Sequence, residues 1–371
     1  MDRTTAATAE RAEYPRWRDA VSPAAQREQA RADALAAVAG ERAAVEERFA
    51  ADWGFALPDS LFTYRAFLHA CGPLETEVLH DLDLAPYGIM DLFDAPGREP
   101  RDGVDVRVHG RYYRDPPEFL TFMHGGSDGL HYGLWYDDGR TSSGVVSYYN
   151  NDGGGVGLPA GTPLEAVRER LERHWRDITD ARYVDPDGRD VYGTLPGEPE
   201  WAQRRHRVRL LREVLMAFDT GDRPEEGAAY HERHRPSPEL FAHGHPDRAE
   251  TLDGAGALAP GDTVAPRGRQ RPYDDHAFCS QLRKELCEDA AAREARTAEA
   301  LRACAAGHPA EALALGRDLH WLSGVGEGFQ TAAGELLAAA YRALDRPALA
   351  AIAGAHHRHR DLPTVDALRA E

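Results

Sequence analysis

The stretch RYYRDPPEFLTFM runs from Arg111 to Met123 and joins a proline-fixed turn to an apolar segment. A proline locks its own φ angle and keeps the residue before it extended, so Pro116 and Pro117 hold the chain on a defined path. From Phe119 onward, aromatic and aliphatic side chains form a run typical of a half-buried β-strand. The stretch therefore predicts a strand that begins directly after a rigid turn.

Further strands are expected on both sides of this one. Residues 132–136 and 144–149 are rich in aromatic and β-branched side chains, and Asp137-Asp138-Gly139 between them is a turn signal. Valines alternate with charged residues over 104–108, which predicts a strand before the turn. We interpret the short strands and tight turns as an antiparallel meander.

Helices are expected around and after this sheet. Helical periodicity is present over residues 24–51, from Asp59 to about Gly72, over 162–176, over 201–218 and again from Asp274 onward. The pattern predicts an α+β fold, in which an N-terminal antiparallel sheet flanked by helices precedes a mainly α-helical C-terminal lobe. The segment 219–272 is rich in Gly, Pro and His and is expected to be irregular.

The length of 371 residues exceeds the usual size of one hydrophobic core, so two lobes are expected. Residues 1–22 lack periodicity and are predicted to be a disordered tail. We place the α+β lobe at 23–185, a linker rich in Asp, Gly and Pro at 186–200, and the helical lobe at 201–371.

Composition limits the classes of partner and compartment. The net charge of −18 repels a phosphate backbone, so direct nucleic-acid binding is not expected, whereas a basic protein is a compatible partner. No apolar run is long enough to cross a bilayer and the N-terminus has no signal-peptide pattern, which predicts a soluble cytoplasmic protein without membrane contact. The four cysteines are too irregularly spaced for a disulfide framework or a paired metal site.

No residue pattern indicates catalysis directly. The histidine clusters HERH, HGH and HHRH lack zinc-ligand spacing, and the glycine-rich segments 153–157 and 254–256 lack the strand-to-helix context of phosphate-binding loops, so turns explain them. Neither a cofactor nor a metal is expected. A stand-alone hydrolase or metalloenzyme has no supporting constellation.

Several motifs in chain order resemble the histone PARylation factor family, the accessory proteins that complete the active site of DNA-damage poly(ADP-ribose) polymerases. DPPEF at 115–119 is the most specific of them. The others are LAPYGIMDLF at 84–93, HYGLWYDD at 131–138, GAG at 254–256, GRQRP at 268–272, LGRDL at 315–319 and LLAAAY at 336–341. The resemblance covers about residues 55–371 and implies an ADP-ribosyltransferase as partner.

The resemblance also implies site residues, one of which is missing here. The family lends a glutamate as general base for serine ADP-ribosylation, and counting back from Leu315-Gly316 places its Asp-Glu pair at Ala305 and Ala306. His308 and Glu311 are the two nearby residues that could replace this base. Arg269 falls where the family carries an arginine that supports polymerase engagement.

Two hypotheses of different classes follow. The first is an accessory protein of ADP-ribosylation that binds an ADP-ribosyltransferase and lacks a complete active site of its own, and so acts as a non-catalytic cofactor protein. The second is a non-enzymatic binding or toxin-immunity module, because the helices and meander of the first lobe also resemble SMI1/KNR4-type proteins. The genes beside this one would separate the two hypotheses.

Overall fold

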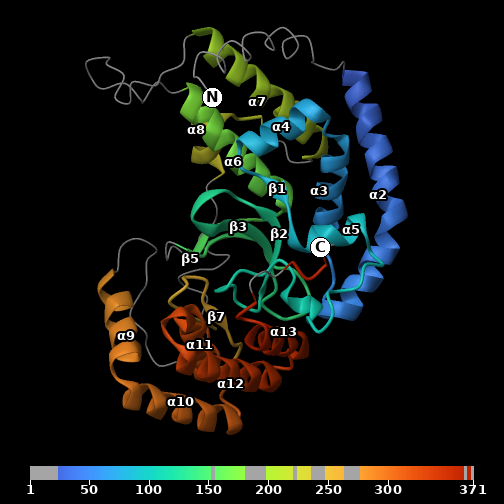
Figure 1. Ribbon diagram of the computed structural model, residues 1–371. Coiled ribbons are helices and arrows are strands. Elements are labelled where there is room, and N and C mark those ends of the chain that lie inside the picture. Colours follow the sequence, from blue (N-terminus) through green and yellow to red (C-terminus); the bar gives the residue numbers. More distant parts are fainter. Residues whose placement is uncertain are drawn as a thin grey trace, which may run out of the picture. The chain divides into compact units, whose positions relative to one another are not determined.

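The computed structural model describes most of the chain (Figure 1). The described residues are 24–151, 155–179, 198–219, 224–234, 247–262, 276–362 and 366–368. The predicted tail at 1–22 and most of the predicted linker lie outside them. The last three residues of that linker, from Glu198, already belong to a helix.

The chain folds into two compact units, each assembled from segments that are distant in sequence. Unit 1 comprises 1–42, 59–85 and 162–235, and unit 2 comprises 43–58, 86–161 and 236–371. The predicted lobes were sequential, whereas residues 86–161 group with the C-terminal segment here. The boundaries at 185 and 200 stay a prediction about which parts fold independently.

Unit 1 is built from helices. They are the first part of α2 (Ala24–Trp53), α3 (Asp59–Ala70), α4 (Pro73–Asp81), α6 (Pro163–Thr179), α7 (Glu198–Phe218) and α8 (Gly227–Arg233). The buried carboxylate of Glu172 lies at the centre of α6, α7 and α8. It accepts hydrogen bonds from Arg168 and Arg212 at 2.5 Å and from the backbone nitrogen of Gly227 at 2.7 Å. Arg212 of α7 is therefore a structural residue.

Unit 2 contains a five-stranded sheet in the order β1-β2-β3-β4-β5. Its strands are β1 (Ala85–Pro86), β2 (Phe119–His124), β3 (Leu130–Trp135), β4 (Gly144–Tyr149) and β5 (Gly155–Ala160). β2 to β5 pair antiparallel with their sequence neighbours. The two edge strands carry Pro86 and Pro159, and proline is tolerated at an edge because it has no N–H to donate to a ladder.

The remaining elements of unit 2 are mostly helical. They are η1 (Gly88–Met90), α5 (Asp91–Asp94), η2 (Val106–Val108), η3 (Ser127–Gly129), the pair β6 (Arg248–Ala249) and β7 (Ala257–Leu258), α9 (His276–Glu288), α10 (Ala290–Ala305), α11 (Ala310–Trp321), η5 (Ser323–Val325), α12 (Glu327–Ala343) and α13 (Pro347–Arg358). α11 packs against α12, and α12 packs against α13 (Figure 1). These elements confirm the predicted α+β class, with a sheet flanked by helices and a helical C-terminal region.

The strand predicted over 104–108 is wrong. Val106 to Val108 form a 3₁₀ turn instead, because the side chain of Asp105 accepts a hydrogen bond from the backbone nitrogen of Arg107 at 3.0 Å. An aspartate that bonds the backbone two residues later closes a turn locally and competes with strand pairing. Alternation of apolar and charged residues is therefore not sufficient evidence for a strand here.

Glycine and proline account for other differences between the predicted and the observed elements. The glycines of 153–157 were interpreted as a turn, but Gly155 opens β5, and a Cβ on Gly157 would lie 2.3 Å from the hydroxyl of Ser147 on β4. Glycine permits this close approach of two strands. Pro73 ends α3 as expected and also begins α4 at its first position. The irregular stretch 219–272 contains α8 and the β6–β7 pair.

No helix within the described residues combines the length and apolar character needed to cross a bilayer.

Gly88 lies where η1 crosses β2, and it gives a test of this packing. Its φ is +60°, and a Cβ would lie 2.4 Å from the carbonyl oxygen of Thr121. We expect Gly88→Ala to lower the free energy of unfolding by at least about 2 kcal/mol, measured by urea denaturation. The control is Gly40→Ala on α2, where a Cβ meets nothing within 4 Å. It should be neutral or stabilising by up to about 1 kcal/mol, and equal effects would contradict the prediction.

Candidate functional site

The turn before β2 is organised by a buried guanidinium. Arg111 is 1 % exposed and donates to the carbonyl oxygens of Phe119 at 2.7 Å, Asp115 at 3.0 Å and Pro116 at 2.5 Å. Burial lowers the pKa of Arg111, because the charged form has lost its water. The three carbonyls take the place of that water and fix the path of the turn.

The carboxylate of Asp115 ties the same turn to the sheet. One oxygen accepts from the backbone nitrogen of Tyr112 at 2.7 Å. The other lies 2.9 Å from Nε2 of His131 on β3 and accepts from Nδ2 of Asn150 at 3.3 Å. The side chain is fully buried, so these partners satisfy it in place of solvent.

Glu118 connects the turn to the C-terminal helices. Its Oε1 accepts a hydrogen bond from the hydroxyl of Tyr341 on α12 at 2.8 Å, and its Oε2 lies 3.1 Å from Nη1 of Arg317 on α11. Burial, followed by the charge of Glu118, raises the pKa of Tyr341 well above its ordinary value. The tyrosine therefore stays protonated and keeps donating.

Arg317 has a second buried carboxylate, that of Asp253, which pairs with its Nη2. Burial alone would lower the pKa of Arg317, but Asp253 and Glu118 raise it well above its ordinary value. Asp253 also accepts from the hydroxyl of Tyr148 on β4 at 3.2 Å. Two anions thus compensate one buried cation.

The GAG segment gives Asp253 this position. Gly254 and Gly256 have φ angles of +79° and +71°, a region that favours glycine, and a Cβ on Gly256 would lie 3.0 Å from the carbonyl oxygen of Ala249. The side chain of Asp253 accepts from the backbone nitrogen of Ala255 at 3.1 Å. The two glycines therefore form the tight turn that presents the carboxylate to Arg317.

These contacts bring four of the sequence motifs together. We name the buried group the Arg317 cluster; it consists of Arg111, Asp115, Glu118, Tyr148, Asp253, Arg317 and Tyr341. DPPEF supplies two of its carboxylates, and GAG directly follows the third. LGRDL supplies Arg317, and LLAAAY supplies Tyr341. Every member of the cluster is buried and makes at least one hydrogen bond, which suits a structural role better than proton exchange with a substrate.

The position that the resemblance assigns to the missing glutamate lies elsewhere in unit 2. Ala306 follows the last turn of α10, and Ala305 and Ala306 are both exposed. His308 lies in the same loop, its side chain 70 % exposed, with Nδ1 3.2 Å from Oδ1 of Asp262. The loop therefore carries one exposed imidazole beside a carboxylate.

The other two candidate residues are Glu311 and Arg269. Glu311 lies in the first turn of α11, 24 % exposed, with Oε1 3.8 Å from Nη2 of Arg296 on α10. A pair between neighbouring helices is an adequate structural reason for this glutamate. Arg269 lies outside the described residues, so its predicted role in engaging a partner stays a prediction.

Sequence reasoning missed Asp253, Arg317 and Asp262. The first two adjoin or belong to motifs that were recognised, GAG and LGRDL, and a charged residue inside an apolar helix such as α11 is a signal for a buried pair. Asp262 carried no such signal. Its partners His308 and Ala310 follow it by 46 and 48 residues, and only the fold brings them together.

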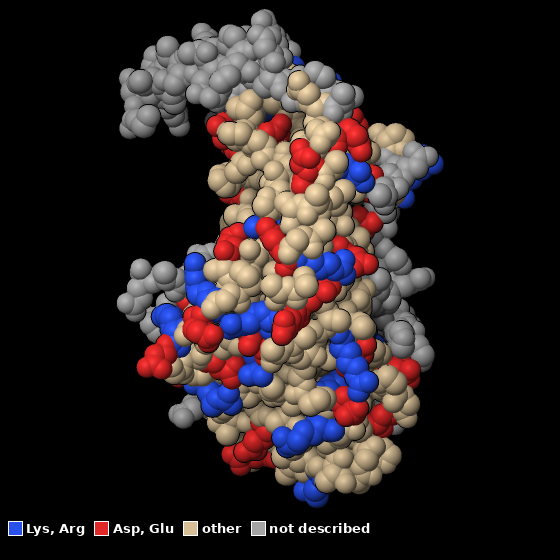
Figure 2. Space-filling view, turned by 90° about the vertical axis from the view of Figure 1, so that its right-hand side faces the viewer, with Lys and Arg blue, Asp and Glu red and all other residues tan. Residues whose placement is uncertain are grey.

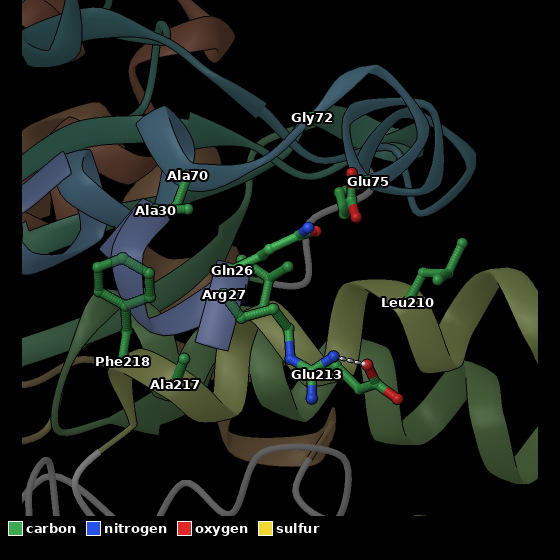
Figure 3. A pocket seen from close by; sticks show the side chains of 11 residues that line it. Gln26, Arg27, Ala30, Ala70, Gly72, Glu75, Leu210, Glu213, Ala217 and Phe218 are labelled. Carbon is green, nitrogen blue, oxygen red and sulfur yellow. Dashed lines mark ion pairs between the residues drawn. The ribbon is translucent and has the colours of Figure 1, made fainter. Parts of the chain in front are cut away.

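The pocket in Figure 3 belongs to unit 1 and lies among α2, α3, α4 and α7. Its volume is about 160 Å³. Arg27 faces Glu213 across it at 2.8 Å, and Phe218 and Leu210 provide apolar wall. The two charged groups compensate each other, and we attach no reaction to this pocket.

Charge is mixed on the surface as well. Figure 2 shows Lys and Arg interspersed with Asp and Glu over the described part of the visible face. On α7, Arg207 pairs with Asp81 at 2.7 Å, and the guanidinium of Arg209 lies 5.2 Å from the ring centroid of Trp175.

Among the described residues, no group of three or more His, Cys, Asp or Glu side chains could hold a metal ion.

Two further buried imidazoles lie beside the turn. His320 donates from Nε2 to the carbonyl of Asp115 at 2.8 Å and accepts at Nδ1 from Arg360 at 3.2 Å. The ring of His356 lies 5.1 Å from that of His320. Burial, followed by the charge of Arg360, lowers the pKa of both imidazoles well below the ordinary value.

The Arg317 cluster predicts a large cost for breaking one pair. Glu118→Gln leaves Arg317 with one buried carboxylate and should lower the free energy of unfolding by about 3–5 kcal/mol, measured by chemical denaturation. Asp345→Asn is the matched control, because the pair of Arg140 and Asp345 is well exposed, with side chains 66 % and 85 % accessible. It should cost at most about 1 kcal/mol. Comparable losses in the two variants would contradict the assignment.

The buried histidines predict a loss of stability in mild acid. Below pH about 6.5 the unfolded chain binds a proton at each imidazole, whereas the folded chain keeps His320 and His356 neutral, so folding weakens as the pH falls. Arg360, Arg111 and His357 face His356 and oppose its protonation. Between pH 7.5 and 5.5 each histidine should account for about 1.4 kcal/mol of this loss.

His356→Leu should therefore reduce the loss by about that amount, measured as the change in urea midpoint between the two pH values. His357→Gln alters an exposed imidazole on the same helix and should keep the full loss. An unchanged pH dependence in His356→Leu would refute the assignment.

Comparison with known proteins gives one partial match. Residues 44–183, fewer than half of the 371, match the family model described as Histone PARylation factor 1, which confirms the resemblance for the motifs within that range. The matched segment contains DPPEF, α3 and β2 to β5. No curated protein matches the chain significantly.

Proposed function

We propose that this chain, whose residues 44–183 carry the Histone PARylation factor 1 match, binds an ADP-ribosyltransferase and acts as its accessory protein. The match supports a PARylation accessory factor in general. We further propose that the partner is of the poly(ADP-ribose) polymerase type and is bound through the helical C-terminal segment. This chain lacks the glutamate that the resemblance implies at Ala306.

The observation that carries the proposal is the Arg317 cluster. The family match ends at residue 183, yet Glu118 inside it pairs with Arg317 and Tyr341 outside it. The family-like motifs beyond the match are thus in contact with the matched segment. This supports extending the resemblance to the C-terminal helices, where we place the partner surface.

A pull-down tests the partner. The full chain, tagged and immobilised, should recover an ADP-ribosyltransferase from lysate of the source cells, with stronger recovery in the presence of a non-hydrolysable NAD analogue. The full chain is needed because residues 201–371 alone would leave Arg317 without Glu118. Recovery of a toxin-like polypeptide and no transferase would favour the immunity module instead.

Charge reversals test the surface. Arg302 is exposed on the last turns of α10, beside the loop that holds Ala306 and His308, whereas Arg140 is exposed in the turn between β3 and β4. Arg302→Glu should weaken recovery of the transferase about tenfold, since a reversed charge at an interface slows association and adds repulsion. Arg140→Glu should leave recovery unchanged, and the opposite result would place the interface elsewhere.

A further inference from the structure

Helix α12 carries an open groove on the surface of unit 2. The groove has a volume of about 520 Å³, and α12 supplies six of its nine lining residues. The helices α10 and α13 pack against α12 and supply the other three, which are Leu301, Gly354 and His357 (Figure 1). The groove therefore leaves one face of α12 open to a docking protein.

The floor of the groove has small side chains. Gly334 and Ala338 lie four residues apart, about one helical turn, and Ala339 follows directly; all three are half-buried. Small side chains at a contact point let two helices approach each other closely. The floor thus fits another helix, but it does not by itself identify which one.

Two charged side chains flank this floor along α12. Glu335 and Arg342 are seven residues apart, so they lie on one face of the helix, about 10.5 Å apart along its axis. Both are exposed, and neither side chain takes part in a hydrogen bond or an ion pair with another described residue. Opposite charges are thus available to a partner on either side of the small residues.

The order of these residues makes the face self-complementary. Glu335 and Arg342 are equally distant from the middle of the pair Ala338-Ala339. A two-fold axis through that middle point places a second α12 antiparallel to the first, as in an isologous dimer. Glu335 of each copy then faces Arg342 of the other, and alanine meets alanine where the helices cross. A foreign helix would need a matched charge pattern, whereas a second copy has it by identity.

We propose that this face of α12 is a self-association surface, through which two copies of the chain pair in an antiparallel arrangement. The inference does not rest on the proposed function. Leu301 and the alanines supply apolar contact, and the two ion pairs fix the register and the orientation. The net charge of −18 opposes association, but in about 0.15 M salt a Debye length of about 8 Å screens this repulsion.

Sedimentation equilibrium of the full chain tests the dimer. At about 100 μM the wild type should have twice the chain mass of 40.8 kDa, because dimer is the main species at that concentration if the Kd is about micromolar. Glu335→Arg places two arginines at each contact and should raise the Kd at least about 100-fold, and Arg342→Glu should do the same with two glutamates. Both side chains are exposed, so the urea midpoints should match the wild type.

A mixture of the two variants tests the antiparallel register. In a mixed pair each contact again joins one arginine and one glutamate, so the equimolar mixture should recover a dimer with the wild-type Kd. A variant that had failed to fold would not give this rescue. Glu47→Arg is the matched control, since it makes the same change in net charge at an exposed glutamate of α2 and should leave the Kd unchanged.

Each outcome decides the proposal. A wild-type chain that keeps a mass of 40.8 kDa at about 100 μM would overturn it. A dimer that survives both reversals would overturn it as well, because the contact would then lie elsewhere. Loss of the dimer without rescue in the mixture would refute the antiparallel pairing. None of these results bears on the recovery of a transferase, so the proposed function is tested separately.

Discussion

The buried charge of Arg317 is the constraint on which unit 2 depends. A guanidinium taken out of water costs several kcal/mol unless anions and hydrogen bonds replace the lost solvent. Here the anions are Glu118 and Asp253, and they come from segments that lie far from α11 in sequence. The sheet, the loop after β6 and the helices must all be in place before the charge is compensated.

The rigid turn before β2 explains how this precision is reached. Pro116 and Pro117 restrict the backbone, and Arg111 fixes the carbonyls around them, so Glu118 has little freedom left when it meets Arg317. On the other side, the two left-handed glycines of the GAG turn place Asp253. Each carboxylate is therefore positioned by its own backbone, and the arginine joins two prearranged partners.

Local sequence patterns predicted the elements better than their assembly. The strands β2, β3 and β4 and the helices α2, α3, α6 and α7 follow from side-chain periodicity and from turn residues, which act over a few positions. β5 was missed because its glycines serve close packing against Ser147, a contact that periodicity does not encode. The 3₁₀ turn at Val106 was missed because one side chain, Asp105, outweighs the alternating pattern around it.

In the candidate site, too, the sequence predicted individual residues better than the contacts between them. His308 was noticed in the sequence for its chemistry, and Glu311 for its position, but the two could not be ranked. The fold separates them, since Asp262 orients the imidazole and Arg296 faces the glutamate. Both partners are charged residues of ordinary appearance, and their meaning depends on a long-range contact.

The interleaved course of the chain has a consequence for its synthesis. Glu118 and Tyr341 are 223 residues apart, and unit 2 takes segments from near both ends of the chain. The sheet is thus synthesised early, but the buried carboxylate of Glu118 has no partner on α11 or α12 until those helices have been made. During translation, which adds about 5–20 residues per second, the nascent chain carries an incomplete core for many seconds. A chain that ends before α11 and α12 lacks Arg317 and Tyr341 and so leaves the carboxylate of Glu118 without these two partners.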